Sequence, residues 1–318
     1  MKDFSRWILV TAAVIALASP LMATGRPEVA QPEATKGPVV VASKIDTEGA
    51  LLGSMIVQIL RADGFEVVDS TEFGTTDVIR RAITSDEIDI YPEYTGNGAF
   101  FFDYNDDSVW KDPQAAFDTV ARLDLQANNI VWLTRAPANN TWAIAVRNDI
   151  AEHNNLVTLE DLANYIRDGG EFKIAASEEF VSRDDVLPAF ERTYDFRVAE
   201  DQMLTFSTGN TATTIQAAAR QTDGVNAAMA YGTDGPVAAL GLRVMEDSLG
   251  VMPVYEPAPI ARRALLEQYP EIETLLQPVF EALDMPTLQS LNAKIAVEGQ
   301  NAALVAQDWL QENGFVAP

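Results

Sequence analysis

The sequence predicts an α/β fold with two lobes, each a mainly parallel β-sheet flanked by helices. Short runs of β-branched residues alternate with amphipathic segments along the chain, a pattern typical of parallel strands joined by helical crossovers. The alternation restarts near residue 142. With 318 residues, the chain is long enough for about two ordinary domains.

The first half of the alternation begins with PVVVAS at residues 38–43, a β-branched run typical of a strand buried on both faces. The next segment has the apolar spacing of an amphipathic helix, and we expect Gly64 to end it. The apolar residues of that helix are Leu52, Met55, Ile56, Ile59 and Leu60. The elements expected after it are strands at 65–70, 87–91 and 129–134, and helices at 75–83 and 112–127.

The second half of the alternation begins with a predicted strand at residues 142–146. The next helix opens with Thr158 and Asp161, which have the spacing of a capping box. We expect Ser182 to cap a later helix that runs to Tyr194. The other elements expected here are strands at 172–177, 203–208 and 226–231, and a helix at 211–221.

A helical tail completes the chain. Residues 265–313 are predicted to be almost wholly helical, with Trp309 as a packing residue. We expect residues 38–139 and 249–318 to form one discontinuous lobe, and residues 140–248 to form the other. Ligands of open α/β sheets bind outside the carboxyl ends of the strands, so two facing lobes predict a binding cleft.

The N-terminus has the pattern of a secretory signal peptide. Lys2 and Arg6 precede a mostly apolar run at residues 7–18, which is too short to span a bilayer and precedes small residues suited to cleavage. A core helix would need a polar face, which this run lacks. We therefore predict a signal peptide over residues 1–23 and a disordered leader over residues 24–37.

The composition limits the cellular setting and the partners. The chain has no cysteine, which excludes disulfides and thiolate metal sites. Export without disulfides suits a bacterial periplasm. The formal net charge of −25 would repel phosphate backbones and anionic lipid headgroups, so we expect neither nucleic acid nor a membrane surface as a partner.

Signatures of enzymes are nearly absent. His153 is the single histidine and lies in the polar stretch AEHNN, so a histidine-based triad or metal site is not expected. Phosphate-binding and nucleophile-elbow motifs are also missing, and no cofactor is predicted. The remaining catalytic hypothesis is an exported hydrolase that uses Glu93 and Asp234 as general acid and base, although 47 acidic residues make a chance pair expected.

Aromatic side chains near the ends of predicted strands favour a binding site. These residues are Tyr94, Trp142, Tyr231 and Tyr255, each close to Gly, Asn, Thr or Pro. A single aromatic residue more often belongs to the core, but four such positions favour a shared function. Aromatic faces without a nucleophile suit a quaternary ammonium group, and each contact contributes about 0.5–2 kcal/mol when desolvated.

Two basic residues suit the opposite end of such a ligand. Lys44 follows the first strand, and Arg183 is predicted to begin a helix just after the strand at 172–177. Both side chains could hold a carboxylate, and backbone N–H groups at a helix start also favour anions. A zwitterion with a methylated cation and a carboxylate would satisfy both ends of the predicted site.

Four segments resemble the periplasmic substrate-binding components of osmoprotectant ABC importers for glycine betaine, choline and carnitine. They are SKIDTEGALLG (43–53), DIYPEYTGNGAFFF (89–102), APANNTWAIAV (136–146) and NAAMAYGTDGPVAALG (226–241). The likeness extends over residues 38–315 and points to the YehZ/OsmF-like subgroup. It implies a type II periplasmic binding protein, acting as a monomer, whose hinged lobes close on the ligand and deliver it to a permease with an ATPase subunit.

The resemblance also implies roles for particular residues. Tyr94, Trp142, Tyr231 and Tyr255 match the aromatic cage of the family, whereas Lys44, Asn97 and Arg183 match its carboxylate-holding positions. Many relatives have Thr in place of Asn97 and Tyr in place of Trp142, so the preferred osmolyte can differ. Tyr91 and residues 100–102 are expected to be supports or core, while Pro92 and the glycines of YPEYTGNG fix the turn. A sensory receptor for the same ligands is an alternative that the sequence does not separate from transport.

Overall fold

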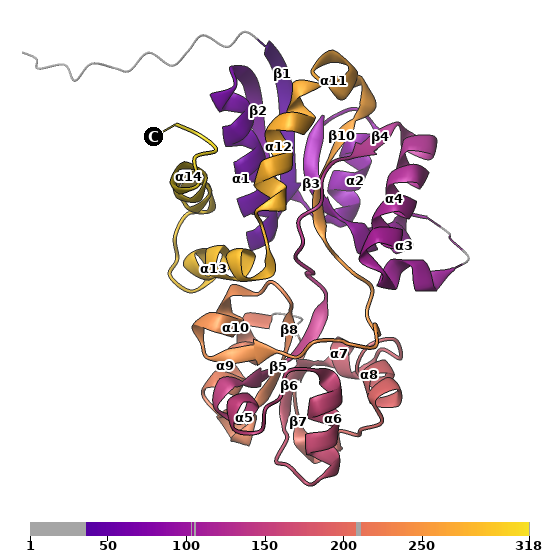
Figure 1. Cartoon of the computed structure of the whole chain (residues 1–318), viewed down its shortest axis with the longest axis vertical. Coiled ribbons are helices and arrows are strands. Elements are labelled where there is room, and N and C mark those ends of the chain that lie inside the picture. The colour runs from indigo at the N-terminus through magenta and orange to yellow at the C-terminus, as the bar shows by residue number, and fades with distance from the viewer. Residues whose placement is uncertain (1–35, 103, 105, 208–210, 318) are drawn as a thin grey trace, which may run out of the picture. The chain divides into compact units, whose positions relative to one another are not determined.

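The computed structural model describes residues 36–102, 104, 106–207 and 211–317 (Figure 1). They belong to one compact unit, Ala34–Pro318. The predicted signal peptide, residues 1–23, lies outside the described residues, as does most of the predicted leader. No helix in the described part of the chain is long and apolar enough to cross a membrane.

The first strand begins earlier than the sequence predicts. Strand β1 spans Lys36–Lys44, so the prediction of a disordered leader is wrong for its last two residues, Lys36 and Gly37. The Lys36 ammonium lies 2.6 Å from a carboxylate oxygen of Asp63 and 3.0 Å from one of Glu271. These ion pairs and the pairing with the next strand hold the start of β1 on the sheet.

Most of the longer helices follow the predicted amphipathic segments. Their bounds are α1 (Thr47–Ala62), α2 (Thr76–Thr84), α3 (Gly98–Phe101), α4 (Pro113–Asn128), α5 (Asn148–His153), α6 (Leu159–Arg167), α7 (Glu178–Ser182), α8 (Leu187–Tyr194), α9 (Thr211–Ala219), α10 (Gly235–Ala239), α11 (Arg263–Gln268), α12 (Glu271–Glu281), α13 (Met285–Ala296) and α14 (Ala302–Glu312). The sequence does not predict the short helices α3, α5, α7 and α10. The capping box of Thr158 and Asp161 is present at the start of α6, as predicted. Asp46 caps α1 by accepting from the Gly49 N–H at 2.8 Å.

The first sheet has the strand order β2-β1-β3-β10-β4. Its other strands are β2 (Phe65–Gly74), β3 (Ile90–Tyr94), β4 (Ile130–Trp132) and β10 (Pro257–Arg262). β1 is parallel to β2 and β3, whereas β10 lies antiparallel between β3 and β4. The apolar side chains of α1, α12, α13 and α14 pack on one face of this sheet, and those of α2 and α4 pack on the other.

The second sheet repeats this arrangement, with the order β7-β6-β8-β5-β9. Its strands are β5 (Trp142–Arg147), β6 (Ile174–Ser177), β7 (Met203–Phe206), β8 (Ala227–Tyr231) and β9 (Leu242–Val244). β6 is parallel to β7 and β8, and β5 is antiparallel to β8 and β9. Four of the five strands in each sheet run in the same direction, but both sheets are mixed, because the fifth strand is antiparallel to both of its neighbours. Each of these antiparallel strands comes just after the chain has crossed from the other sheet.

Successive residues of a strand in the second sheet pack into two different cores, one on each face of the sheet. On β5, Ile144 packs with side chains of α6 and α8, while its neighbour Ala145 packs with those of α9 and α10. This alternation is the period of two expected for a strand between two layers of helices. We call each sheet, together with the helices that cover it, a lobe.

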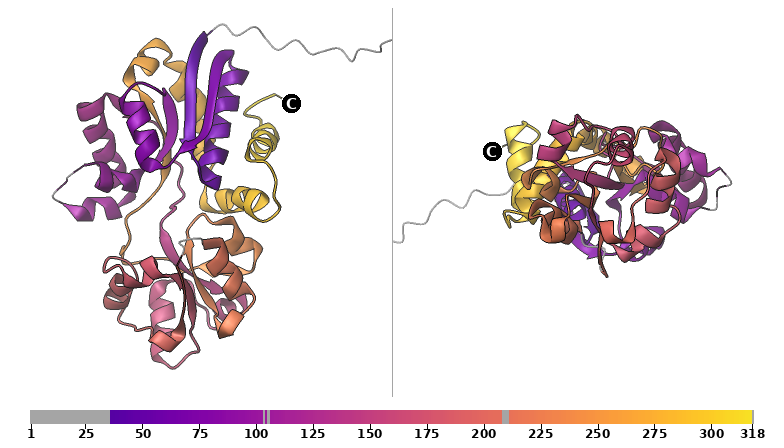
Figure 2. Two further views of the ribbon diagram at one scale, coloured as in Figure 1. Left: turned by 180° about the vertical axis from the view of Figure 1, so that it is seen from behind. Right: turned by 90° about the horizontal axis from the view of Figure 1, so that it is seen from below.

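The helical tail belongs to the first lobe. α12, α13 and α14 all contact α1, and the views agree that these C-terminal helices lie beside it (Figures 1 and 2). Trp309 is 8% exposed and lies in the same core as Leu52 and Met55 of α1. The prediction that Trp309 is a packing residue is therefore confirmed.

The third strand lies further along the chain than predicted. The prediction places it at residues 87–91, but β3 ends at Tyr94 and includes Pro92. β3 is extended because it pairs with β10, where Tyr94 lies opposite Pro257. A local pattern cannot show this pairing, since the partner strand comes much later in the chain.

The helix predicted to run from Ser182 to Tyr194 begins later in the structure: α8 starts at Leu187, and Ser182 is instead the last residue of a separate short helix, α7. α7 begins after Ser177, whose hydroxyl accepts from the Phe180 N–H at 3.0 Å, and Arg183 ends it with an extended backbone. The prediction that Arg183 begins a helix is therefore wrong, and no helix N-terminus supports it as an anion site. His153 is the last residue of α5 rather than a loop residue, and it is exposed.

Candidate functional site

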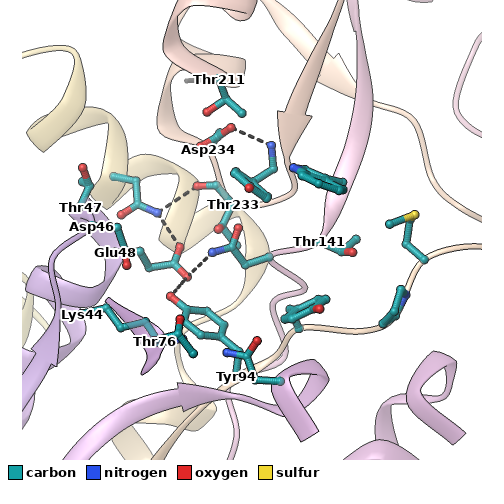
Figure 3. A pocket seen from close by; sticks show the side chains of 18 of the residues that line it. Lys44, Asp46, Thr47, Glu48, Thr76, Tyr94, Thr141, Thr211, Thr233 and Asp234 are labelled. Carbon is teal, nitrogen blue, oxygen red and sulfur yellow. Dashed lines mark hydrogen bonds between the residues drawn. The ribbon is translucent and has the colours of Figure 1, made fainter. Parts of the chain in front are cut away.

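A cavity of about 950 Å³ is lined by residues of both lobes (Figure 3). All seven residues predicted to bind the ligand line this cavity, namely Lys44, Tyr94, Asn97, Trp142, Arg183, Tyr231 and Tyr255. They lie at or near strand ends, as the sequence predicts, and in the segment that returns to the first lobe. The fold thus brings the predicted set together, while the individual binding roles stay predictions.

The second lobe contributes a continuous aromatic wall. Antiparallel pairing of β5 and β8 places Trp142 opposite Tyr231, and their rings stack with centroids 6.2 Å apart and planes 17° apart. Phe180, which is fully buried, meets Trp142 edge-on at a centroid distance of 6.1 Å. This contact fixes the orientation of the indole, because edge-to-face packing is a favoured geometry for aromatic rings.

The glycines of the turn after β3 make room for aromatic rings. A Cβ atom at Gly96 would lie 2.8 Å from ring atoms of Tyr255, and one at Gly98 would lie 2.4 Å from the ring of Trp110. Gly98 has an ordinary helical φ of −55°. The prediction that these glycines fix the turn therefore needs correction, because the close approach of one ring to each glycine, rather than an unusual backbone at Gly98, excludes a side chain there.

Glu48 is a cavity residue that the sequence reading missed. Its carboxylate accepts hydrogen bonds from the Tyr94 hydroxyl at 2.9 Å, Asn140 Nδ2 at 3.2 Å and Asn292 Nδ2 at 2.7 Å (Figure 3). Burial raises the pKa of Glu48 from 4.5 to about 7, although hydrogen bonds from Thr233, Asn292 and Tyr94 act in the opposite direction. In the sequence, an acidic residue in the first turn of a helix gives no sign of this role, because such residues are common there.

We expect the pKa of Glu48 to make stability depend on pH. Between pH 4.5 and 7 the unfolded carboxyl is ionised while the folded one keeps its proton. The contribution of Glu48 to the free energy of unfolding is therefore fully present below the pKa of the unfolded state. It is lost as the pH rises through the pKa of the folded state, a decrease of about 3 kcal/mol. Urea unfolding of the wild type and of Glu48→Gln at several pH values measures this difference.

The matched control for this experiment is Glu267→Gln. Glu267 pairs with Arg263 on the exposed surface of α11 and is not among the described residues that line the cavity. The wild-type and Glu267→Gln curves should run parallel over the whole pH range. Parallel curves for the wild type and Glu48→Gln would contradict the prediction.

Lys44 and Asn97 reach the cavity, but both already contact a carboxylate of the protein. Lys44 Nζ lies 2.6 Å from Glu93 Oε1, and Asn97 Nδ2 donates to the same oxygen at 2.7 Å. The Tyr94 N–H also donates to it, and the Tyr91 hydroxyl donates to Oε2. Glu93 is 0% exposed, so in this conformation it is not accessible as the general acid or base of a hydrolase.

Arg183 is also paired within the cavity. Its Nε and Nη2 atoms lie 3.0 and 2.6 Å from the two carboxylate oxygens of Asp185, and Nη1 lies 3.0 Å from Glu179 Oε1. Its Cζ atom lies 4.9 Å from the centroid of the Trp142 ring. The guanidinium therefore covers part of one predicted cage ring, just as Lys44 Nζ lies 4.7 Å from the Tyr94 centroid.

The two segments that cross between the lobes are paired with each other. The Tyr255 N–H donates to Asn139 Oδ1 at 2.8 Å, and the Asn140 N–H donates to the Tyr255 carbonyl at 2.9 Å. Tyr255 lies on one crossing segment, and Asn140 lies on the other, just before Trp142 at the start of β5. A change in the angle between the lobes would therefore act directly on the residues that line the cavity.

Helix α13 of the first lobe also forms hydrogen bonds to the second lobe. Asn292 Nδ2, which bonds Glu48, donates to the Thr233 carbonyl at 3.0 Å, and Gln289 Nε2 donates to the Gly232 carbonyl at 2.7 Å. A Cβ atom at Gly235 would lie 2.1 Å from the backbone of α13, so only glycine permits this approach. These contacts position the turn that follows Tyr231.

The phenylalanines at residues 100–102 differ from one another. Phe100 is 68% exposed and lines the cavity, so the prediction that it is a support or core residue is wrong. Phe101 and Phe102 lie against the guanidinium of Arg80, with Cζ 4.2 and 5.9 Å from their ring centroids. Tyr91 is fully buried, as predicted. The sequence FFF does not distinguish these environments because short α3 turns successive side chains in different directions.

Comparison with known proteins identifies the family. Residues 37–312 match the OpuAC family model, described as the substrate-binding domain of ABC-type glycine betaine transport systems. The chain belongs to the OpuAC family. It is 56% identical over 287 residues to the glycine betaine-binding protein YehZ of Escherichia coli, covering 90% of this chain and 94% of that protein. It is 31% identical to a glycine-betaine-binding protein of Pseudomonas aeruginosa, covering 86% and 87% of the two chains.

Solved structures agree with membership of the OpuAC family. The structure of apo YehZ from Escherichia coli is 57% identical, with a TM-score of 0.84 over 88% of this chain and 100% of that one. A glycine betaine/carnitine/choline ABC transporter structure has a TM-score of 0.76 at 20% identity, over 88% and 99% of the two chains, and so supports the fold. The OpuAC family consists of substrate-binding components of transporters, and this chain has their two-lobed α/β architecture.

Proposed function

We propose that this protein captures a quaternary-ammonium zwitterion such as glycine betaine and delivers it to an ABC permease for osmoprotection. The observation that carries the proposal is that one cavity receives four aromatic side chains from both lobes, namely Tyr94, Trp142, Tyr231 and Tyr255. A trimethylammonium group has apolar methyls and a delocalised charge, so it is attracted to such rings without needing a hydrogen-bond acceptor. The names of the relatives from Escherichia coli and Pseudomonas aeruginosa point to the same ligand.

The carboxylate of the ligand would bind at the basic side of the cavity. Lys44, Asn97 and Arg183 provide N–H groups there and line the same space as the rings. Because their N–H groups are already directed at protein carboxylates, ligand binding would require these contacts to rearrange. The indole of Trp142 and the amide of Asn97 shape the cage and would decide which osmolyte fits best.

The proposed setting is the periplasm. Residues 1–23 would act as a cleaved signal peptide, and the mature protein would act as a monomer with a permease and its ATPase subunit. The lobes would comprise residues 38–139 with 249–318, and residues 140–248. This division agrees with the chain crossing between the sheets before β5 and before β10.

Calorimetry with glycine betaine, choline and carnitine tests the proposal. Glycine betaine should bind more tightly than choline, because choline lacks the carboxylate that the basic residues would hold. Glycine is the matched control ligand, since it has the carboxylate but no methylated cation, and it should not bind. Equal affinity for choline and glycine betaine would remove the carboxylate role of Lys44 and Arg183, and no binding of any methylated ligand would contradict the proposal.

A sensory receptor for the same ligands is a second candidate. The chain is 26% identical to the substrate-binding protein CosB of a chemotactic signal transduction system in Halobacterium salinarum, over 87% of this chain and 84% of that protein. Uptake of labelled glycine betaine by cells with and without the protein separates the two functions. Loss of uptake without the protein supports transport, whereas unchanged uptake with lost chemotaxis supports a receptor.

A further inference from the structure

The side chains around the cavity carry more negative charge than a zwitterionic ligand requires. Among the described residues that line it, the basic ones are Lys44 and Arg183. The acidic lining residues are Asp46, Glu48, Glu179, Asp185 and Asp234. Burial raises the pKa of Glu48 to about 7 and also raises the pKa of Asp234, but Asp46, Glu179 and Asp185 alone outnumber the two basic residues. A carboxylate that enters the cavity therefore meets more anionic than cationic groups, although a zwitterion needs positive charge at one end.

Arg183 shows most clearly how acidic side chains neutralise the basic residues of the cavity, because two carboxylates contact its guanidinium from two directions. Asp185 engages Nε and Nη2 in a two-point contact, and Glu179 contacts Nη1. The guanidinium holds the pKa of Asp185 below its usual range, so this carboxyl is ionised at neutral pH. One guanidinium and two carboxylates form a group with a net charge of −1, which lies beside the aromatic wall at Trp142.

The position of Arg183 has two consequences for a zwitterion. The carboxylate of the ligand would be repelled by Glu179 and Asp185 unless one of them released the guanidinium. The methylated cation of the ligand would compete with the guanidinium for the face of Trp142, because Arg183 Cζ lies 4.9 Å from the centroid of that ring. A quaternary ammonium ion without a carboxylate would meet only the second obstacle and would be attracted by both carboxylates.

We propose that Glu179 and Asp185 set the charge preference of the site by holding Arg183 against Trp142. They lower the affinity for zwitterionic quaternary-ammonium ligands and raise it for cationic ones. This inference rests on the proposed function, because it needs a ligand of that class in the cavity. All three side chains are partly exposed, so solvent screening limits the effect to a change of roughly threefold to tenfold in the ratio of the two affinities.

The test uses the full-length mature protein with Glu179→Gln, Asp185→Asn and the double substitution. Calorimetry with glycine betaine and choline gives the ratio of their affinities for each variant. The double variant should bind glycine betaine more tightly and choline more weakly than the wild type. Each single variant should shift the ratio in the same direction by a smaller factor.

Asp184→Asn is the matched control. Asp184 is adjacent in sequence and its side chain is 89% exposed, but it pairs with Arg192 and is not among the described residues that line the cavity. Its loss removes the same charge without releasing Arg183, so the ratio should stay near the wild-type value. An equal shift in Asp184→Asn would overturn the inference, since net charge alone would then explain the result.

The outcomes also separate this inference from the proposed function. If the wild type binds neither glycine betaine nor choline, the proposed function fails and the inference fails with it. If the wild type binds glycine betaine but the double variant keeps the same ratio, or binds it more weakly, only the inference is overturned. Thermal unfolding of each variant verifies that the compared proteins are folded.

Discussion

Replacing Glu93 with glutamine should lower the free energy of unfolding by about 3–5 kcal/mol, the usual cost of removing one partner from a buried ion pair. Lys44 is 6% exposed, and Nζ contacts Glu93 Oε1 at 2.6 Å. Without the carboxylate, its ammonium would lie out of water and lose this counter-charge. Glutamine keeps nearly the same volume, so a cavity would not explain the loss. Urea unfolding at neutral pH measures the effect.

Glu271→Gln is the control for this prediction. Glu271 also pairs with a lysine, Lys36, but both side chains are about one-third exposed and hydrated. Its substitution should change stability far less than Glu93→Gln, because water screens the pair and solvates the remaining ammonium. Similar losses in the two variants would show that burial of Lys44 with Glu93 is not what makes the pair important.

Replacing Tyr231 or Tyr255 with alanine should weaken binding of glycine betaine more than tenfold. Each substitution removes a cation-π face and the apolar area that covers the ligand methyls, and together these losses exceed about 1.4 kcal/mol. Both rings line the cavity from different segments, Tyr231 from the end of β8 and Tyr255 from the crossing segment. Calorimetry of the two variants measures the loss.

The corresponding Tyr→Phe substitutions at residues 231 and 255 keep the ring face and remove the hydroxyl. They should retain most of the affinity if the faces bind the cation. Unchanged affinity in both alanine variants would mean that these rings are structural. A large loss in the phenylalanine variants would instead assign the effect to the hydroxyl groups.

Periodicity and local chemistry in the sequence were sufficient to predict most elements of the fold. The apolar stripe of α1, the capping box of α6 and the β-branched run of β1 each depend on neighbouring residues, and all three are present. Part of the cavity lining could also be predicted, because strand ends are readable from the pattern and parallel sheets gather their ends along one edge, although Glu48 was missed and Phe100 was assigned to the core. The aromatic residues at those ends are visible in the sequence itself.

The partners of the charged groups depended on tertiary structure. Glu93 is paired with Lys44 because β1 and β3 are neighbours in the sheet, and Glu48 meets Asn292 because α13 folds back onto α1. Arg183 is different, because its partners Glu179 and Asp185 lie only four and two residues away in the sequence. Tertiary structure decides only that its guanidinium lies beside the ring of Trp142. Local patterns determine where the strands and helices form, whereas burial and the pairings of Glu93 and Glu48 arise from residues that are distant in sequence and meet only when the chain packs.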